Sequence, residues 1–293
     1  MLNFAMVTLM IVLGTMQSFF CKAYSDEYPG QPDRSSSVFS VVSGLFIAFA
    51  GLILTGFQIS VSPITVWLAL LNAVVVFFFN LFMVSASKSG PYSVQMTFML
   101  SGGILIPAFV SKFFFHDELS LVQWISVAII VIAIALVSYK SGDNAIRNKW
   151  FWVFCVGLFV TNGFYGMLLD IQQRKSGAGE KEEMALITYL GVFLLAFVFA
   201  AIHRRKNFFR DFRQTKKSLI FLLLCSFVTA AAIMVMLHTL SRMDTTIVYT
   251  FDNAGVLLFS VLCSAIFLRE KMSAVNIVGC ALMIGGLICV SAF

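Results

Sequence analysis

Charged residues are scarce in this chain of 293 residues, because only 12% of its side chains carry a charge. A soluble domain ordinarily has about 25% charged residues. The shortage excludes a soluble enzyme, a disordered chain and a nucleic-acid binder that works in water. Hydrophobic residues make up 60% of the sequence, and the mean hydropathy is +0.94. One soluble fold could not bury so much apolar surface, so we expect a protein that a lipid bilayer surrounds.

Several chemical signatures are also missing. The three histidines lie far apart, and the six cysteines include no C-x-x-C pair, so neither a metal site nor a disulfide framework is predicted. The sequence contains no Walker A loop, no H-E-x-x-H motif and no G-x-S-x-G motif. We predict that the protein is not an enzyme and has no catalytic residues, no cofactor, no metal and no nucleic-acid partner. Its partners are expected to be a small-molecule solute and membrane lipid.

Ten apolar runs are long enough to cross a bilayer, which requires about 20 helical residues. Backbone polar groups inside lipid must be satisfied within the protein, so each run is predicted to be a helix, and no sheet is expected. The runs cover residues 2–21, 36–57, 64–86, 91–115, 119–139, 149–169, 184–203, 218–239, 244–268 and 273–293. The predicted fold class is therefore an all-α, multi-pass integral membrane protein, which we expect in the cell membrane.

The two halves of the chain resemble each other at an offset of 153 residues. Hydropathy and connector length agree, and the acidic connectors align with Asp117 over Glu270. The pattern predicts one five-helix repeat in residues 1–144 and a second in residues 145–293, within one membrane domain. Because five is an odd number, the second repeat must enter the membrane in the opposite direction. Inverted repeats of this kind are typical of secondary transporters.

The connector before the last run carries a resemblance to a known family. Glu270 lies three residues before Ser273, ahead of a final run rich in small residues, and Asp117 precedes Ser120 in the same way. This pattern is similar to the EamA-type members of the drug/metabolite transporter superfamily. The resemblance implies ten helices around a central cavity, alternating access, and export of amino acids, metabolites or drugs. Related small multidrug-resistance proteins use an acidic residue in the first helix, whereas Gln17 is the most polar candidate there in this chain.

Asp252 is the most informative polar residue. It is the only acidic residue well inside a predicted span, roughly 12 Å along the helix axis, where a carboxylate costs about 2.5–3.5 kcal/mol on insertion scales. A coupled proton, a bound cation or a polar partner could offset this cost, and a role in packing alone is the alternative. The other residues predicted to bind or couple the solute are Gln17, Asn80, Gln95, Thr97, Tyr249, Thr250 and Asn253.

Small and helix-breaking residues occur at matching places in the two halves. Gly102, Gly103 and Pro107 lie in one run, and Gly255 lies in the corresponding run. Such interruptions in equivalent spans point to the binding region of a transporter, and they permit bending. We predict hinges at these four positions. Close packing of helix backbones is the other interpretation, and the two roles are compatible.

The sequence thus predicts a secondary transporter that moves a small metabolite or drug-like solute by alternating access, with proton coupling left open. A passive channel, or a membrane scaffold without transport, is the alternative. Orientation is also open. Most of the 20 Lys and Arg residues follow odd-numbered runs, which places both termini outside by the positive-inside rule, whereas the family resemblance suggests both termini inside. The sequence is compatible with a monomer and does not exclude a homodimer.

Overall fold

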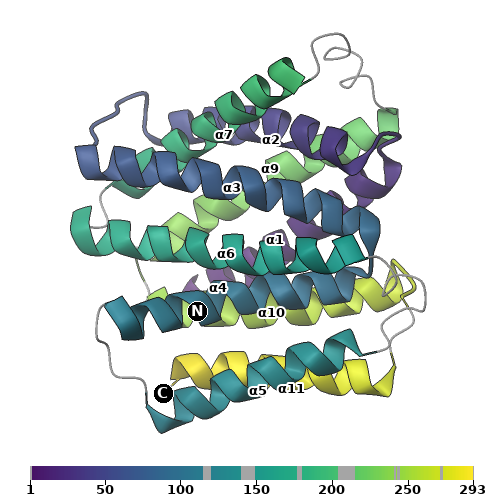
Figure 1. Ribbon diagram of the computed structural model, residues 1–293. Helices are drawn as coiled ribbons and strands as arrows, with labels where there is room; N and C mark the ends of the chain where they lie inside the picture. The colour runs from purple at the N-terminus through teal and green to yellow at the C-terminus, as the bar shows by residue number, and fades with distance from the viewer. Residues whose placement is uncertain are drawn as a thin grey trace.

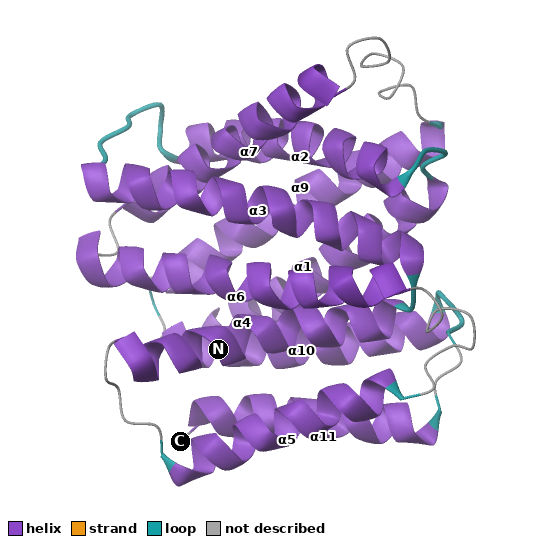
Figure 2. Ribbon diagram, viewed as in Figure 1, coloured by secondary structure: helices purple, strands orange, loops and turns teal. Residues whose placement is uncertain are grey.

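The computed structural model describes residues 2–114, 120–139, 149–176, 180–203, 215–240, 242, 245–270 and 273–292. Within these ranges the chain forms ten helices and no strand (Figures 1 and 2). The helices are α1 (Leu2–Glu27), α2 (Pro32–Leu54), α3 (Pro63–Ser89), α4 (Tyr92–Phe114), α5 (Leu121–Ser138), α6 (Lys149–Ser176), α7 (Lys181–His203), α9 (Lys216–Leu240), α10 (Thr245–Ile266) and α11 (Ala274–Ala292). Each predicted apolar run coincides with one of these helices.

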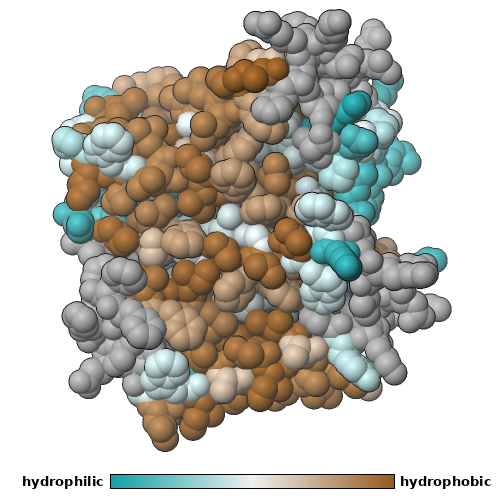
Figure 3. Space-filling model, in the orientation of Figure 1, coloured by the Kyte–Doolittle hydropathy of each residue, from teal (hydrophilic) through white to brown (hydrophobic). Residues whose placement is uncertain are grey.

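The outer surface of the protein is strongly apolar. Among the described residues, six helices are long and apolar enough to cross a membrane, namely α1, α2, α3, α6, α7 and α9, and shorter apolar stretches lie in α5, α10 and α11. Large side chains such as Trp67 and Phe227 are exposed, and the face in Figure 3 is hydrophobic between more polar ends. Such an extensive exposed apolar surface marks contact with lipid. The chain is therefore a multi-pass integral membrane protein.

The two halves of the chain interleave. Helix α1 packs most extensively against α9, α2 against α7, α3 against α6, and α5 against α11. In each pair, one helix comes from residues 2–138 and the other from residues 149–292. Figure 1 shows α5 and α11 together at one edge of the molecule. The largest buried apolar cluster draws side chains from both halves, so neither half has a complete core of its own.

Helix starts repeat at the offset of 153 residues. Helices α9, α10 and α11 each begin 153 residues after α3, α4 and α5, respectively. At the start of α5, Gln123 N donates to the Ser120 hydroxyl at 3.2 Å, while Ser120 N donates to Gln123 Oε1 at 2.8 Å. At the start of α11, Asn276 N donates to the Ser273 hydroxyl at 3.3 Å, and Ser273 N donates to Asn276 Oδ1 at 2.9 Å. Both helices therefore begin with the same reciprocal cap.

Glu270 links the end of α10 to the start of α4. Its carboxylate accepts hydrogen bonds from the N–H groups of Tyr92 and Ser93 at 2.6 and 3.3 Å, and from the hydroxyls of Ser93 and Ser264 at 3.0 and 2.5 Å. The first N–H groups of a helix have no partner inside the helix, and a negative charge there also interacts favourably with the helix dipole. The acidic connector residue of the second half thus caps a helix of the first half.

Glu180 makes a similar link between the start of α7 and the start of α3. Its carboxylate accepts from the Ser62 hydroxyl at 2.7 Å and from Ser62 N at 3.2 Å. Hydrogen bonds from the Thr65 and Ser62 side chains lower the pKa of the Glu180 carboxyl. A carboxyl whose pKa is lowered by folding stabilises the protein above its unfolded pKa, and that contribution disappears as the pH falls through the folded pKa. This link is therefore intact at neutral pH and weakens in acid.

Replacing Glu270 with Ala is expected to lower the free energy of unfolding by about 2 kcal/mol, the upper range for a lost helix cap. The reason is that the backbone donors of Tyr92 and Ser93 lose their acceptor together. Thermal denaturation in detergent measures the loss. Asp26→Ala is the control, because the Asp26 carboxylate is exposed and paired with Lys22, and an exposed pair contributes about 0–1 kcal/mol. Equal melting temperatures for the two variants would contradict the capping role.

Candidate functional site

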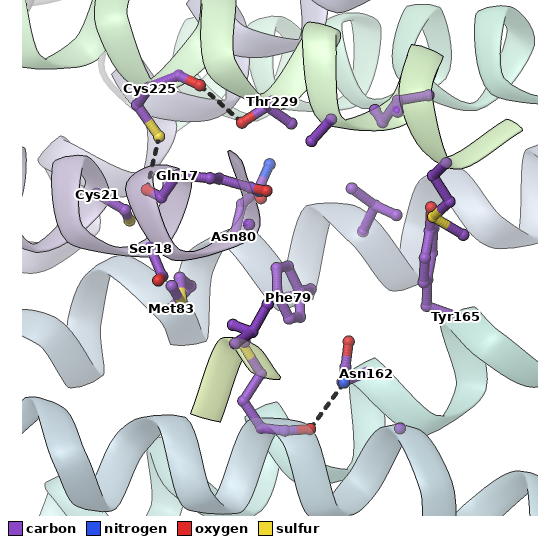
Figure 4. Close-up of a pocket in the computed structure, with 18 of the residues that line it drawn as sticks. Gln17, Ser18, Cys21, Phe79, Asn80, Met83, Asn162, Tyr165, Cys225 and Thr229 are labelled. Carbon is purple, nitrogen blue, oxygen red and sulfur yellow. Dashed lines mark hydrogen bonds between the residues drawn. The ribbon is translucent and has the colours of Figure 1, made fainter. Parts of the chain in front are cut away.

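A cavity with a volume of about 200 Å³ lies among the helices. Its described wall comes from α1, α2, α3, α4, α6, α7, α9 and α10, so both halves of the chain contribute. Figure 4 shows Gln17 of α1, Phe79 and Asn80 of α3, and Asn162 and Tyr165 of α6 around it. The helices at the edge of the molecule, α5 and α11, add no described residue to the wall.

Most of the cavity wall is apolar or aromatic. Met10, Ile47, Val76, Met99 and Val256 supply much of the aliphatic surface. The carboxylate and amide side chains on the wall are those of Gln17, Asn80, Asn162, Asp252 and Asn253. Cavities that bind small molecules generally have this composition, in which a few polar groups orient a ligand within an apolar enclosure.

Asp252 is the one acidic side chain on the described part of the cavity wall. Its Oδ1 is buried and has no hydrogen-bond partner among the described residues. A Cβ atom added to Gly14 of α1 would lie 4.0 Å from this oxygen, so the carboxylate faces α1 at a residue without a side chain. A buried carboxylate oxygen without a donor is costly. The oxygen is therefore available to a proton or to a ligand in the cavity.

Two amide side chains meet beside Gly103 of α4. A Cβ atom on Gly103 would lie 2.6 Å from Asn162 Nδ2 and 3.8 Å from Asn253 Oδ1. Asn162 Nδ2 also donates to the carbonyl of Met99 at 2.7 Å. Because Gly103 has no side chain, the two amides from α6 and α10 can occupy this part of the cavity wall together.

Hydroxyl groups join three helices near one end of the cavity. The hydroxyls of Ser18 and Tyr92 lie 2.5 Å apart, and the Tyr92 hydroxyl donates to Ser260 Oγ at 3.3 Å. Ser18 lines the cavity, and Tyr92 and Ser260 are completely buried. These bonds connect α1, α4 and α10 at the same end of the molecule where Glu270 caps α4. Three helices that surround the cavity are thus fastened together there.

The predicted site residues do not all lie together. The side chains of Tyr249 and Thr250 lie outside the described residues. Those that line the cavity are Gln17, Asn80, Asp252 and Asn253. Their roles in binding or coupling stay predictions.

Gln95 and Thr97 are completely buried, but they do not line the cavity. Gln95 accepts from the Ser87 hydroxyl at 3.0 Å and donates to the Met83 carbonyl at 3.2 Å. Thr97 donates to the carbonyl of Ser93 at 2.9 Å. In this structure their polar atoms bond other parts of α3 and α4, and their roles in binding stay predictions.

The predicted hinge residues lie where helices approach closely. A Cβ atom on Gly102 would lie 2.0 Å from the Phe159 carbonyl oxygen on α6, and one on Gly255 would lie 2.5 Å from Ile11 Cδ1 on α1. Pro107 lies inside α4, which continues beyond it. Close packing at Gly102 and Gly255 is therefore observed, while bending at these residues stays a prediction.

The cavity also includes polar residues that were not predicted from the sequence to belong to the site. Tyr165 and Tyr189 bring aromatic rings from α6 and α7, and Asn162 and Thr229 bring an amide and a hydroxyl from α6 and α9. Polar residues inside spans usually bond a neighbouring helix. A single sequence does not distinguish that role from one at a cavity, so no pattern in the chain could have selected them.

Residues 149–292 match the EamA-like transporter family. This half of the chain belongs to the EamA-like transporter family. The EamA-like half supplies α6, α7, α9, α10 and α11, and with them Asp252 and Asn253 of the cavity. Membership of this family indicates a membrane transporter of small solutes, and the family is one of transporters and not of enzymes.

The fold of almost the whole chain is similar to that of a solved structure. A solved structure, described only as "Crystal structure of protein", has a TM-score of 0.63 and 14% identity, with 99% of this chain and 97% of that chain covered. At this identity the similarity concerns the fold alone. No curated protein matches the sequence.

Proposed function

We propose that this EamA-like protein is a secondary transporter that carries a small metabolite or drug-like solute across the cell membrane by alternating access. The observation that carries the proposal is the cavity between the two interleaved halves, with an unpartnered oxygen of Asp252 on its wall. Substrate sites of such transporters lie near the middle of the membrane at the interface of the repeats. The match of residues 149–292 to a transporter family supports the same function.

The proposal includes ten membrane spans arranged as inverted repeats in residues 1–144 and 145–293. The common helix starts support it. The packing supports it as well. When each helix is replaced by its equivalent in the other half, the contacting pair α1 and α9 becomes α6 and α3, and the contacting pair α4 and α6 becomes α10 and α1. Both resulting pairs are also in contact. Superposition of the halves about an axis in the membrane plane is the direct test. Gly102 should then lie over Gly255, and halves with the same membrane orientation would contradict the proposal.

Alternating access requires that one end of the cavity be closed at a time. We assign the closed end to the hydrogen-bonded hydroxyls of Ser18, Tyr92 and Ser260. At the equivalent positions of the other half, 153 residues away, the sequence has Thr245 for Tyr92 and Pro107 for Ser260. Proline has no hydroxyl, so the opposite end cannot form the same set of bonds. The two ends would therefore close with different stabilities.

Removing the Tyr92 hydroxyl should favour opening of this end. Tyr92→Phe keeps the ring and deletes the bonds to Ser18 and Ser260, each of which contributes about 0.5–1.5 kcal/mol. A change of about 1.4 kcal/mol shifts the ratio of open to closed molecules about tenfold. A cysteine at Asn80 in a background without the six native cysteines reports the shift, through faster labelling by a water-soluble thiol reagent from this end.

Tyr24→Phe is the matched control for that experiment. Tyr24 is also completely buried, and its hydroxyl donates to the carbonyl of Ser35 at 2.8 Å, away from α4 and α10. The control loses a buried hydrogen bond without touching the proposed closed end. Equal labelling rates in the Tyr92→Phe and Tyr24→Phe proteins would show that Tyr92 does not close the cavity.

Solute flux in reconstituted vesicles tests the transport proposal itself. A thermal-shift screen against amino acids, nucleosides and amines first identifies a solute, because a ligand of the native state raises its apparent stability. A carrier should show flux that saturates with solute concentration, and a proton-coupled carrier should also respond to a pH gradient. A passive channel would not saturate at similar concentrations. If no solute that binds shows more flux than it does in protein-free vesicles, the protein is better described as a membrane scaffold without transport.

A further inference from the structure

We propose that the cavity selects a small organic monocation, a protonated amine with a compact apolar or aromatic body, and rejects zwitterions and anions of the same size. The inference rests on the proposed function, because it names the class of solute that the cavity would carry. It follows from the charges, the buried oxygen and the volume of the cavity, each of which narrows the choice of ligand.

The charge balance of the wall is the first step. Among its described residues Asp252 is acidic, and none is Lys, Arg or His. Lys22 follows the lining residue Cys21 in the chain, but its ammonium donates to Asp26 at 3.0 Å and to the carbonyl of Ser87 at 2.5 Å at the end of the helices. Asp252 therefore has no cationic partner on the described wall. A buried ion without a counter-ion is unstable, and a bound ammonium would supply one.

The geometry at Asp252 is the second step. Its buried Oδ1 lacks a donor among the described residues. An ammonium group offers three donors and no acceptor, so it can bond this carboxylate and also neutral oxygens of the wall. Gln17 and Asn80 add amide oxygens to the same cavity. The wall is thus suited to receive N–H donors next to one negative charge.

The size and lining of the cavity define the rest of the ligand. A dry cavity of about 150 Å³ binds benzene, so the volume of about 200 Å³ here admits an aromatic ring with a short substituent. Phe79, Tyr165 and Tyr189 lie on the wall. Aromatic faces attract cations when both are removed from water, so these rings can hold the apolar body and also favour a positive charge.

The same features disfavour a ligand carboxylate. A zwitterion would place a second negative charge in the cavity, and none of the described wall residues is cationic. The donors that remain are neutral amides and hydroxyls, and Asn162 Nδ2 is already engaged with the Met99 carbonyl. Repulsion from Asp252 adds to the cost of removing the carboxylate from water. An amine should therefore bind better than the amino acid that contains it.

Three matched ligands test the proposal on the purified full-length protein. Phenethylamine is the probe, phenylalanine adds a carboxylate to it, and 3-phenylpropionate keeps the carboxylate and lacks the amine. Calorimetric titration at about pH 8, where a free carboxyl is ionised and an alkyl amine is protonated, should give phenethylamine the tightest binding. Leaving one member of a buried charge pair without its partner costs about 30-fold or more in affinity, so we expect at least that preference over both carboxylates.

Two variants connect the preference to the carboxylate. Asp252→Asn should weaken phenethylamine binding by about 30-fold or more, and Asp26→Asn, which removes the same charge from an exposed site, should not. The proposal is overturned if phenylalanine or 3-phenylpropionate binds as tightly as phenethylamine, if Asp252→Asn binds the amine normally, or if neither phenethylamine nor benzylamine binds.

Binding and flux separate this inference from the transport proposal. Phenethylamine that binds through Asp252 but does not cross reconstituted vesicles would support the selectivity and count against transport. Saturable flux of phenylalanine that is unchanged in Asp252→Asn would support transport and overturn the selectivity.

Discussion

Asp252→Asn is expected to abolish saturable solute flux in reconstituted vesicles, or to remove its pH dependence, while the protein stays folded and inserted. The wild-type Oδ1 is buried without a described partner, so the carboxylate is the group on the described wall that can exchange a proton or bind a cation. Asparagine has nearly the same shape and carries no charge. The buried charge that costs about 2.5–3.5 kcal/mol on insertion scales is then gone, so the variant should be at least as stable as the wild type.

Three measurements on the Asp252→Asn protein check this result: expression, thermal stability, and flux at several pH values. Asp26→Asn is the matched control, because that carboxylate lies at an exposed helix end in a pair with Lys22. If the Asp252→Asn protein is stable and its flux keeps the wild-type rate and pH dependence, Asp252 is a packing residue. The case for a coupled carrier would then lose the residue that best supports it.

Gly102→Ala is expected to destabilise the protein by about 3 kcal/mol, the upper part of the range for an overpacked site. The added Cβ would lie 2.0 Å from the carbonyl oxygen of Phe159 and 2.6 Å from its Cα. These are backbone atoms of α6, so no side-chain rotation relieves the overlap, and the two helices must separate. Because this contact joins the two halves beside the cavity, separation should also reduce ligand binding.

Substitutions at two other glycines, where an added Cβ would be less crowded, provide the comparison for this prediction. A Cβ on Gly255 would meet the Cδ1 end of Ile11 at 2.5 Å, where a side chain can move, and one on Gly285 would meet nothing within 4 Å. Melting temperatures in detergent should therefore fall most for Gly102→Ala, less for Gly255→Ala, and not at all for Gly285→Ala. A gain in helix propensity of up to about 1 kcal/mol accompanies all three changes. Equal melting temperatures across the series would show that the helices at Gly102 separate at little cost.

The helices could be predicted because the bilayer imposes one length on every span. A run of about 20 apolar residues must become a helix in lipid whatever surrounds it, and the ten runs coincide with the ten described helices. The cap formed by Ser273 and Asn276 is local as well, since it joins residues three apart. The transporter family followed from a connector of a few residues, and the match of residues 149–292 confirms it.

The composition of the cavity depends instead on how the helices are rotated and packed. Gln95 and Asn80 are both amides within apolar runs, yet Asn80 lines the cavity while Gln95 bonds Ser87 and the Met83 backbone. Hydropathy does not separate the two positions, and contacts with other helices determine which side faces inward. The same holds for Glu270, whose partner Tyr92 lies 178 residues earlier in the chain. Only the folded arrangement brings such distant groups together, because interhelical packing and hydrogen bonding act between segments that the sequence keeps far apart.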